Sequence, residues 1–237
     1  MNNISIAATD RVFVLTGAGI SAESGLPTFR ASDGLWAGHR VEDVCTPEAL
    51  HRNPALVWEF YSARRASAQQ AQPNPAHFAL AQLEAHLGDR FFLCTQNVDD
   101  LHERAGSKRL VHMHGELAKS RCEQDCGCPP IEDFAVYRSL DDVPRCTCGA
   151  RLRPHIVFFG EIPLEMDRIQ REIDRATLML VVGTSGSVYP AANFVHWARI
   201  AGARTVYIGP EAPLNAAAFT HVVEGRAGEV LPNLFAV

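Results

Sequence analysis

Five short runs of apolar, β-branched or aromatic residues predict buried strands along the chain. They span 11–15, 91–95, 156–159, 178–182 and 204–208. Segments with helical character lie between them, at 76–87, 166–176 and 190–201. Buried strands that alternate with helices are typical of an α/β fold with a mostly parallel sheet.

Two regions interrupt this alternation. Residues 39–72 have helical character, and Pro47 and Pro54 mark the expected starts of helices. Residues 119–154 are rich in cysteine and proline and contain no long apolar run. We therefore predict that both regions are inserts between strands of the sheet, and that residues 225–237 form a short closing helix.

Composition and charge narrow the class of protein. The chain has 237 residues, of which 47% are hydrophobic, and a formal net charge of -5. This length suits one large domain, or one domain with a small insert. The negative charge argues against broad nucleic-acid binding, which depends on surplus basic charge. No apolar run approaches membrane-spanning length, and MNNISIAATD lacks the pattern of a secretion signal, so we expect a cytosolic protein without membrane contact.

The cysteines are clustered, with five of the seven between Cys122 and Cys148. In the cytosol such clusters more often bind metals than form disulfides. Cys122, Cys126 and Cys128 are followed after a loop by Cys146 and Cys148, a pattern typical of a structural zinc site. Four thiolates complete a tetrahedron, so one of the five cysteines is spare.

Two glycine-containing loops follow predicted strands. In TGAGISAESGLPTFR, residues 16–30, Gly17 and Gly19 would let the backbone approach a phosphate, although the third glycine of a dehydrogenase fingerprint is missing. The loop GTSGSVYPA, residues 183–191, would add a second surface for the same ligand. The alternative for both loops is a plain tight turn.

The segment TQNVDDLH, residues 95–102, also follows a predicted strand. Ligands bind beyond the carboxyl ends of strands in open α/β sheets, so Gln96, Asn97 and Asp99 are expected at the ligand edge. Their amide and carboxylate groups suit a carboxamide and ribose hydroxyls. The alternative is a helix N-cap, for which Asn and Asp are common.

The motif HMHG places His112 and His114 two residues apart, on one face of an extended segment. A neutral imidazole can take a proton from a hydroxyl group near pH 7. The alternative is a hydrogen-bonded, partly buried histidine. A metal pair is a further possibility, but no third ligand accompanies it with an obvious spacing.

Tyr61 and Arg64 lie three residues apart within the helical insert, and therefore on one helix face. A phenol and a guanidinium that converge there could hold one carboxylate, because arginine can bind it with two hydrogen bonds. The alternative is an amphipathic helix whose arginine extends to solvent.

Taken together and in this order, the motifs resemble those of sirtuins, which are NAD-dependent protein-lysine deacylases. The resemblance rests on residues 17–30, 95–102, His114-Gly115, the split cysteines, Phe159-Gly160-Glu161 and Gly183-Thr184-Ser185, and it extends from Arg11 to about Gly228. It implies a Rossmann-like large domain formed by 1–38, 73–118 and 155–237. It also implies a small domain with a helical module, 39–72, and a zinc module, 119–154, and an active site in the cleft between the domains.

The resemblance implies NAD as cosubstrate, one structural zinc and acylated lysines of proteins or peptides as substrates. The acyl group would pass to ADP-ribose, with release of nicotinamide. His114 would be the general base, and Asn97 would share in catalysis. The residues implied in NAD binding are Gly17, Ala18, Gly19, Ser21, Thr28, Phe29, Arg30, Trp36, Gln96, Asn97, Val98, Asp99, Gly183, Thr184, Ser185, Gly209, Glu211 and Ala227.

The substrate and metal residues follow from the same resemblance. Residues 157–161 (Val157, Phe158, Phe159, Gly160 and Glu161) would pair with the substrate backbone by strand addition. Tyr61 and Arg64 match the branch that accepts succinyl- or malonyl-lysine, and Thr28 also fits that branch. We predict Cys122, Cys126, Cys146 and Cys148 as zinc ligands, with Cys128 as an alternative to Cys126.

Other functions remain as alternatives at this point. They are a plain deacetylase, a non-catalytic NAD or ADP-ribose sensor with a zinc interaction module, a dehydrogenase and a mono-ADP-ribosyl transferase. The departure from the dehydrogenase fingerprint disfavours hydride transfer, and His114 disfavours the sensor. We expect a monomer that does not bind nucleic acid directly.

Overall fold

The computed structural model describes residues 4–7, 9–28, 35–36 and 38–234, and its centre is a six-stranded parallel sheet. The strand order is β11-β10-β9-β1-β4-β5, and each neighbouring pair runs parallel. The strands are β1 (Val12–Thr16), β4 (Phe91–Thr95), β5 (Leu110–His112), β9 (Leu178–Val182), β10 (Arg204–Gly209) and β11 (His221–Glu224). This sheet confirms the predicted α/β fold class.

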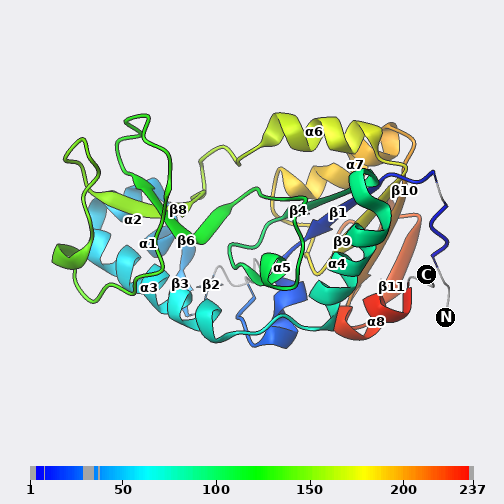
Figure 1. Cartoon of the computed structure of the whole chain (residues 1–237), viewed down its shortest axis with the longest axis horizontal. Coiled ribbons are helices and arrows are strands. Elements are labelled where there is room, and N and C mark those ends of the chain that lie inside the picture. Colours follow the sequence, from blue (N-terminus) through cyan, green and yellow to red (C-terminus); the bar gives the residue numbers. More distant parts are fainter. Residues whose placement is uncertain (1–3, 8, 29–34, 37, 235–237) are drawn as a thin grey trace.

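Helices cover both faces of this sheet (Figure 1). Helices α4 (Pro75–Leu87) and α8 (Ala227–Leu234) pack on one face, against side chains such as Val12 and Val14. Helices α6 (Met166–Arg175) and α7 (Phe194–Ile200) cover the other, against Phe13 and Leu15. Successive residues of a strand point to opposite faces, so a strand covered on both sides is apolar throughout. The continuous run VFVLT has this character.

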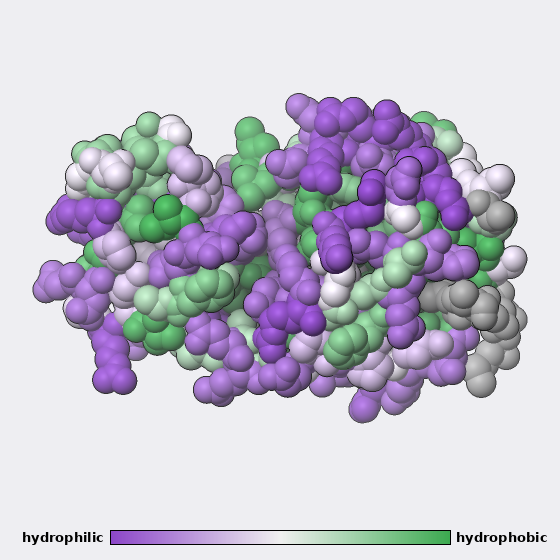
Figure 2. Space-filling view, in the orientation of Figure 1, coloured by the Kyte–Doolittle hydropathy of each residue, from purple (hydrophilic) through white to green (hydrophobic). Residues whose placement is uncertain are grey.

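Helix α6 shows how the pattern of the sequence sets the orientation of a helix. Ile169 and Ile173, four residues apart, are fully buried towards the sheet. Figure 2 shows hydrophilic residues gathered over the outer surface of the same helix. Within the part of the chain that the structure describes, no helix has the combination of length and hydropathy needed to cross a membrane.

A second, antiparallel sheet has the order β7-β6-β8. Its strands are β6 (Gly115–Cys122), β7 (Ile131–Glu132) and β8 (Leu152–Ile156). The predicted strand at 156–159 is therefore wrong, because the strand ends at Ile156 and belongs to this smaller sheet. The apolar run at its carboxyl end lies beneath α3, where Ile156 and Phe158 are buried. Strands β5, β6 and β11 were not predicted, because they are short or carry many polar residues.

The region 39–72 is helical, as predicted, after a short hairpin of β2 (Leu35–Trp36) and β3 (His39–Arg40). Its helices are α1 (Val41–Val44), α2 (Pro47–Arg52) and α3 (Pro54–Gln70). Thr46 and Asn53 cap the second and third helices, and proline occupies the first turn of each. The remaining α-helix is α5 (Leu101–Arg104), and short 3-10 helices span Ala18–Ser24, Gly88–Arg90, Leu140–Asp142, Ala191–Asn193 and Ala216–Ala218. The residue boundaries of the two predicted modules stay predictions.

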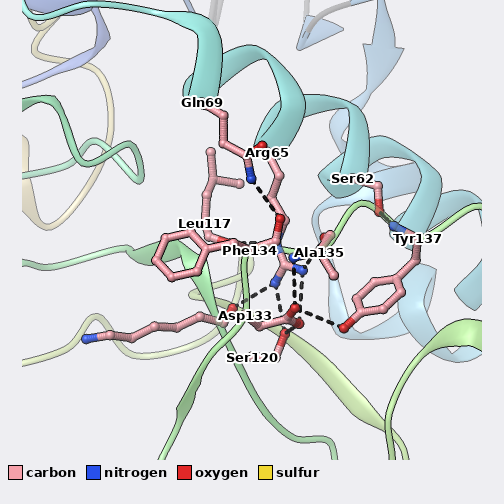
Figure 3. Close-up of polar contacts among 10 residues, drawn as sticks. Ser62, Arg65, Gln69, Leu117, Ser120, Asp133, Phe134, Ala135 and Tyr137 are labelled. Carbon is pink, nitrogen blue, oxygen red and sulfur yellow. Dashed lines mark hydrogen bonds and ion pairs between the residues drawn. The ribbon is translucent and has the colours of Figure 1, made fainter.

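Arg65 joins α3 to the antiparallel sheet, as Figure 3 shows. Its side chain is 1% exposed and forms an ion pair of 3.0 Å with Asp133, itself 6% exposed. The guanidinium also donates hydrogen bonds to the carbonyl oxygens of Leu117, Lys119 and Ala135. A buried charge is stable only where such partners replace water.

Removal of the Asp133 carboxylate is expected to destabilise the protein strongly. Asp133→Ala leaves the buried guanidinium without its counter-charge, which costs roughly 3–5 kcal/mol of the free energy of unfolding. The matched control is Asp43→Ala, because Asp43 pairs with Arg52 at 3.1 Å with both side chains about half exposed. An exposed pair contributes about 1 kcal/mol or less. Equal losses for the two variants in urea unfolding would contradict the expected role of Arg65.

Candidate active site

A cavity of about 1010 Å³ lies where the carboxyl ends of the parallel strands face the antiparallel sheet. The loops after β1, β4 and β9 form one side of it, as expected for ligand sites in open α/β sheets. Most of the predicted site residues line it: Gly17, Ala18, Gly19, Ser21, Thr28, Trp36, Arg64, Gln96, Asn97, Val98, Asp99, His114, Val157, Phe158, Phe159, Gly160, Glu161, Gly183, Thr184, Ser185 and Glu211.

The two glycine loops are packed directly against each other. The N–H of Gly19 donates to the carbonyl oxygen of Gly183 at 2.8 Å. A Cβ atom on Gly17 would lie 2.8 Å from the same oxygen, and one on Gly19 would lie 2.7 Å from the Gly183 Cα. Gly183 itself has a φ of 64°, in the region that favours glycine. These glycines are therefore required for the contact between the loops, whatever they add to phosphate binding.

Asn97 and Asp99 are linked through Ser21 at the cavity wall. The Asn97 amide donates to Ser21 Oγ at 3.1 Å, and the Ser21 hydroxyl donates to Asp99 Oδ2 at 3.2 Å. Burial raises the pKa of Asp99 above its ordinary value. The side-chain nitrogen of the neighbouring Gln96 is buried without a hydrogen-bond partner. A buried donor of this kind is expected to bind a ligand, because leaving it unpaired is costly.

His114 faces the cavity and has the properties of a general base. Burial lowers its pKa to about 4, although the bond to the Gln96 carbonyl acts in the opposite direction. The ring is therefore neutral at pH 7. Nδ1 lies 3.2 Å from that carbonyl oxygen, which can only accept, so the proton is on Nδ1 and Nε2 is the basic nitrogen. His112 does not line the cavity, so the two histidines do not share one role.

Four cysteine sulfurs converge away from this cavity. Cys122, Cys126, Cys146 and Cys148 have their Sγ atoms all within 4.8 Å of one another. The closest pairs are 3.5 Å and 3.6 Å apart, near the roughly 3.8 Å expected for thiolates at 2.3 Å from a tetrahedral zinc. Cys128 lies outside the cluster and its thiol contacts Thr147 at 3.3 Å. The cluster therefore fits one structural zinc.

Comparison with known proteins identifies the family. The family model described as "Sir2 family" matches residues 17–190. The chain belongs to the Sir2 family. It is 54% identical over 224 residues to a protein of Salmonella typhimurium named NAD-dependent protein deacylase, covering 94% of this chain and 81% of that protein.

Solved Sir2 structures have the same fold as this chain. A Sir2 homologue–NAD complex superposes with a TM-score of 0.86 at 41% identity, over 96% of this chain and 89% of that chain. A Sir2 complex with a p53 peptide and NAD superposes with a TM-score of 0.82 at 31% identity, over 95% and 92% of the two chains. The predicted sirtuin family is thus confirmed.

Tyr61 and Arg64 of this Sir2 protein have different environments. Arg64 lines the cavity, with its guanidinium 3.9 Å from the centre of the Trp36 ring. Tyr61 does not line the cavity and has no exposed surface. Its hydroxyl donates to the sulfur of Cys45 at 3.2 Å, and Cys45 does line the cavity. The prediction missed Cys45, because no local pattern links residues 45 and 61.

The segment 157–161 is not a strand in the structure, and its pairing with a substrate backbone stays a prediction. Four of its N–H groups are already bonded within the protein. Val157 donates to His114, Phe158 to the Glu161 carboxylate, Phe159 to Cys45 and Glu161 to Phe158. Arg153 holds the Glu161 carboxylate at 2.6 Å. Backbone pairing with a substrate through these four groups would first have to break these bonds.

The remaining predicted site residues lie elsewhere. Gly209 ends β10 and Ala227 begins α8, and neither lines the cavity. Phe29 and Arg30 lie outside the described residues. The contacts of all four residues with NAD stay predictions.

Proposed function

We propose that this protein is an NAD-dependent protein-lysine deacylase. The observation that carries the proposal is that neutral His114 shares one cavity with the glycine loops and with Gln96, Asn97 and Asp99. The name of the Salmonella relative and the NAD and peptide complexes of Sir2 structures support it. Acylated lysines on proteins or peptides would be the substrates.

The residues around the cavity would have different roles in the reaction. NAD, when bound, supplies the ADP-ribose that accepts the acyl group as nicotinamide leaves. Asn97, Asp99 and the unpaired Gln96 amide would hold the nicotinamide and ribose side through hydrogen bonds. His114 would take a proton from a ribose hydroxyl at Nε2, because its Nδ1 is bonded to the Gln96 carbonyl.

The direct test is a product assay with NAD and peptides that carry acetyl-, malonyl- or succinyl-lysine. We expect nicotinamide, the peptide with an unmodified lysine, and O-acyl-ADP-ribose in equal amounts. Nucleotide binding without nicotinamide release would instead support the non-catalytic sensor. ADP-ribose attached to protein would support mono-ADP-ribosyl transfer.

We further propose that the acyl group preferred is one that ends in a carboxylate. Arg64 supports this, because its Nε is buried without a hydrogen-bond partner, and within the described residues the guanidinium forms no ion pair with a carboxylate. An arginine at a cavity wall can bind a carboxylate with two hydrogen bonds. The Tyr61 hydroxyl would bind the acyl carboxylate only after its hydrogen bond to the Cys45 sulfur is broken.

Arg64→Met is expected to lower kcat/KM for succinyl-lysine on the order of a hundredfold, because the acyl carboxylate loses its charged partner. Deacetylation by the same variant should change by less than about threefold, since an acetyl group has no charge to pair. Cys45→Ala removes the partner of the Tyr61 hydroxyl, so the ratio of desuccinylation to deacetylation should rise. Cys45→Ser, whose hydroxyl can still accept that hydrogen bond, is its matched control. Equal loss of both activities in Arg64→Met would refute the carboxylate proposal and leave deacylation intact.

A further inference from the structure

His112 is held between two elements beside the cavity. It ends β5 and is 9% exposed. Its Nε2 lies 2.7 Å from the Glu103 carboxylate on α5, and its Nδ1 lies 2.8 Å from the carbonyl oxygen of Asn97. The ring therefore connects a helix to the segment that carries Asn97 and Asp99.

Both partners of this ring are hydrogen-bond acceptors. A backbone carbonyl has no proton to donate, and an ionised carboxylate has none either. Burial raises the pKa of Glu103, but the hydrogen bond to His112, the charge of His112 and smaller effects together outweigh burial and lower that pKa, so the carboxylate is ionised at pH 7. Each ring nitrogen must then carry a proton, which makes His112 an imidazolium.

The charged groups around His112 favour this state. Burial lowers the pKa of His112, but Glu103, the Asn97 carbonyl and Glu116 on β6 together outweigh burial. The pKa of His112 is therefore raised above its ordinary value. His112 in turn lowers the pKa of Asp99, although burial outweighs this effect, and it disfavours protonation of His102 on α5. Lys119 on β6 also faces Glu103.

The bond to His112 fixes Asn97 at its carbonyl end. At the other end, the Asn97 N–H donates to Thr95 Oγ1 at 3.0 Å. The Asn97 backbone is thus held on both sides, and its side chain is directed to Ser21 and through it to Asp99. Loss of either bond would release the residues that face the cavity.

We propose that His112 is a positioning residue for NAD binding, which as an imidazolium holds the Asn97–Asp99 segment between Glu103 and Thr95. The inference rests on the proposed function only in taking NAD as the ligand. The charge is present below the raised pKa of His112 and is lost as the pH rises through it. NAD affinity should therefore fall on the alkaline side.

The first measurement needs neither turnover nor NAD. Ring nitrogen chemical shifts of the ligand-free protein should show His112 doubly protonated at pH 7, and Glu103→Gln should lower the pH of its transition. Glu103 is 38% exposed at its side chain, so this variant is expected to fold. A neutral His112 ring in the wild-type protein at pH 7 would overturn the proposal.

The second measurement is NAD binding by calorimetry from about pH 6 to about pH 9. We expect the wild-type Kd to rise about tenfold across the transition, and Glu103→Gln to show the rise at lower pH. Folded His112→Gln, neutral throughout, should bind about tenfold more weakly at pH 7, without that transition. The exposed His86→Gln is the control. If His112→Gln bound NAD as the wild type does, His112 would have no positioning role. If the binding results were as expected but the protein removed no acyl group, only the proposed deacylase function would be contradicted.

Discussion

His114→Ala is expected to reduce NAD-dependent deacylation by about a thousandfold, while the protein stays folded and still binds NAD. Loss of a general base typically costs 10² to 10⁴ in rate, that is about a thousandfold. The His114 side chain lines the cavity, and its Nδ1 is bonded to the Gln96 carbonyl oxygen. Its removal should therefore leave packing nearly unchanged. The measurement is kcat for formation of deacylated peptide and O-acyl-ADP-ribose from an acyl-lysine peptide.

The controls separate chemistry from folding. Thermal unfolding and NAD calorimetry on His114→Ala should match the wild-type values closely, and His86→Ala should retain full activity. Activity within about threefold of wild type would show that His114 is not the base, because such a change is far below the usual effect of losing one.

Cys146→Ser is expected to abolish zinc binding and to unfold the region around the cysteine cluster. Structural zinc contributes on the order of 10 kcal/mol of folding free energy in small metal-dependent units. The cluster has little apolar core of its own, with Val143, Leu152 and Trp58 as its buried hydrophobic neighbours. We expect one zinc per chain in the wild-type protein and none in the variant, by elemental analysis, with a lower melting temperature.

Cys128→Ser is the matched control, because Cys128 lies outside the group of four sulfurs. It should keep its zinc and its melting temperature. A variant Cys128→Ser without zinc, beside a Cys126→Ser variant that retains it, would reverse the assignment of these two residues.

The parallel sheet could be predicted from the sequence because its central strands are apolar on both faces. VFVLT, FFLCT and LMLVV are buried at every position. The alternation of such runs with helices specifies the fold class. Strands β6 and β11 escaped prediction, because β6 carries several polar residues and β11 has only four residues, two of them polar. The apolar run at 156–159 led to a wrong strand prediction, because burial beneath α3 gives an apolar pattern without a strand.

Site residues that lie close together in the sequence could be predicted, whereas contacts between residues that only folding brings together could not. Gln96, Asn97 and Asp99 follow β4 directly, so their place at the sheet edge follows from the strand. The pairing of Tyr61 with Cys45 depends on the packing of α1 against α3. The different roles of His112 and His114 depend on where β5 ends, which the sequence pattern does not mark.

The two adjacent arginines of α3 lie in different environments. Arg64 lines the cavity, whereas Arg65 is bound to Asp133 and to the strand that ends at Cys122. Helix α3 therefore contributes one residue to the cavity wall and another that anchors the antiparallel sheet. A substitution in α3 can therefore alter the cavity wall, the stability of the fold, or both, and a change in activity has to be read beside the free energy of unfolding.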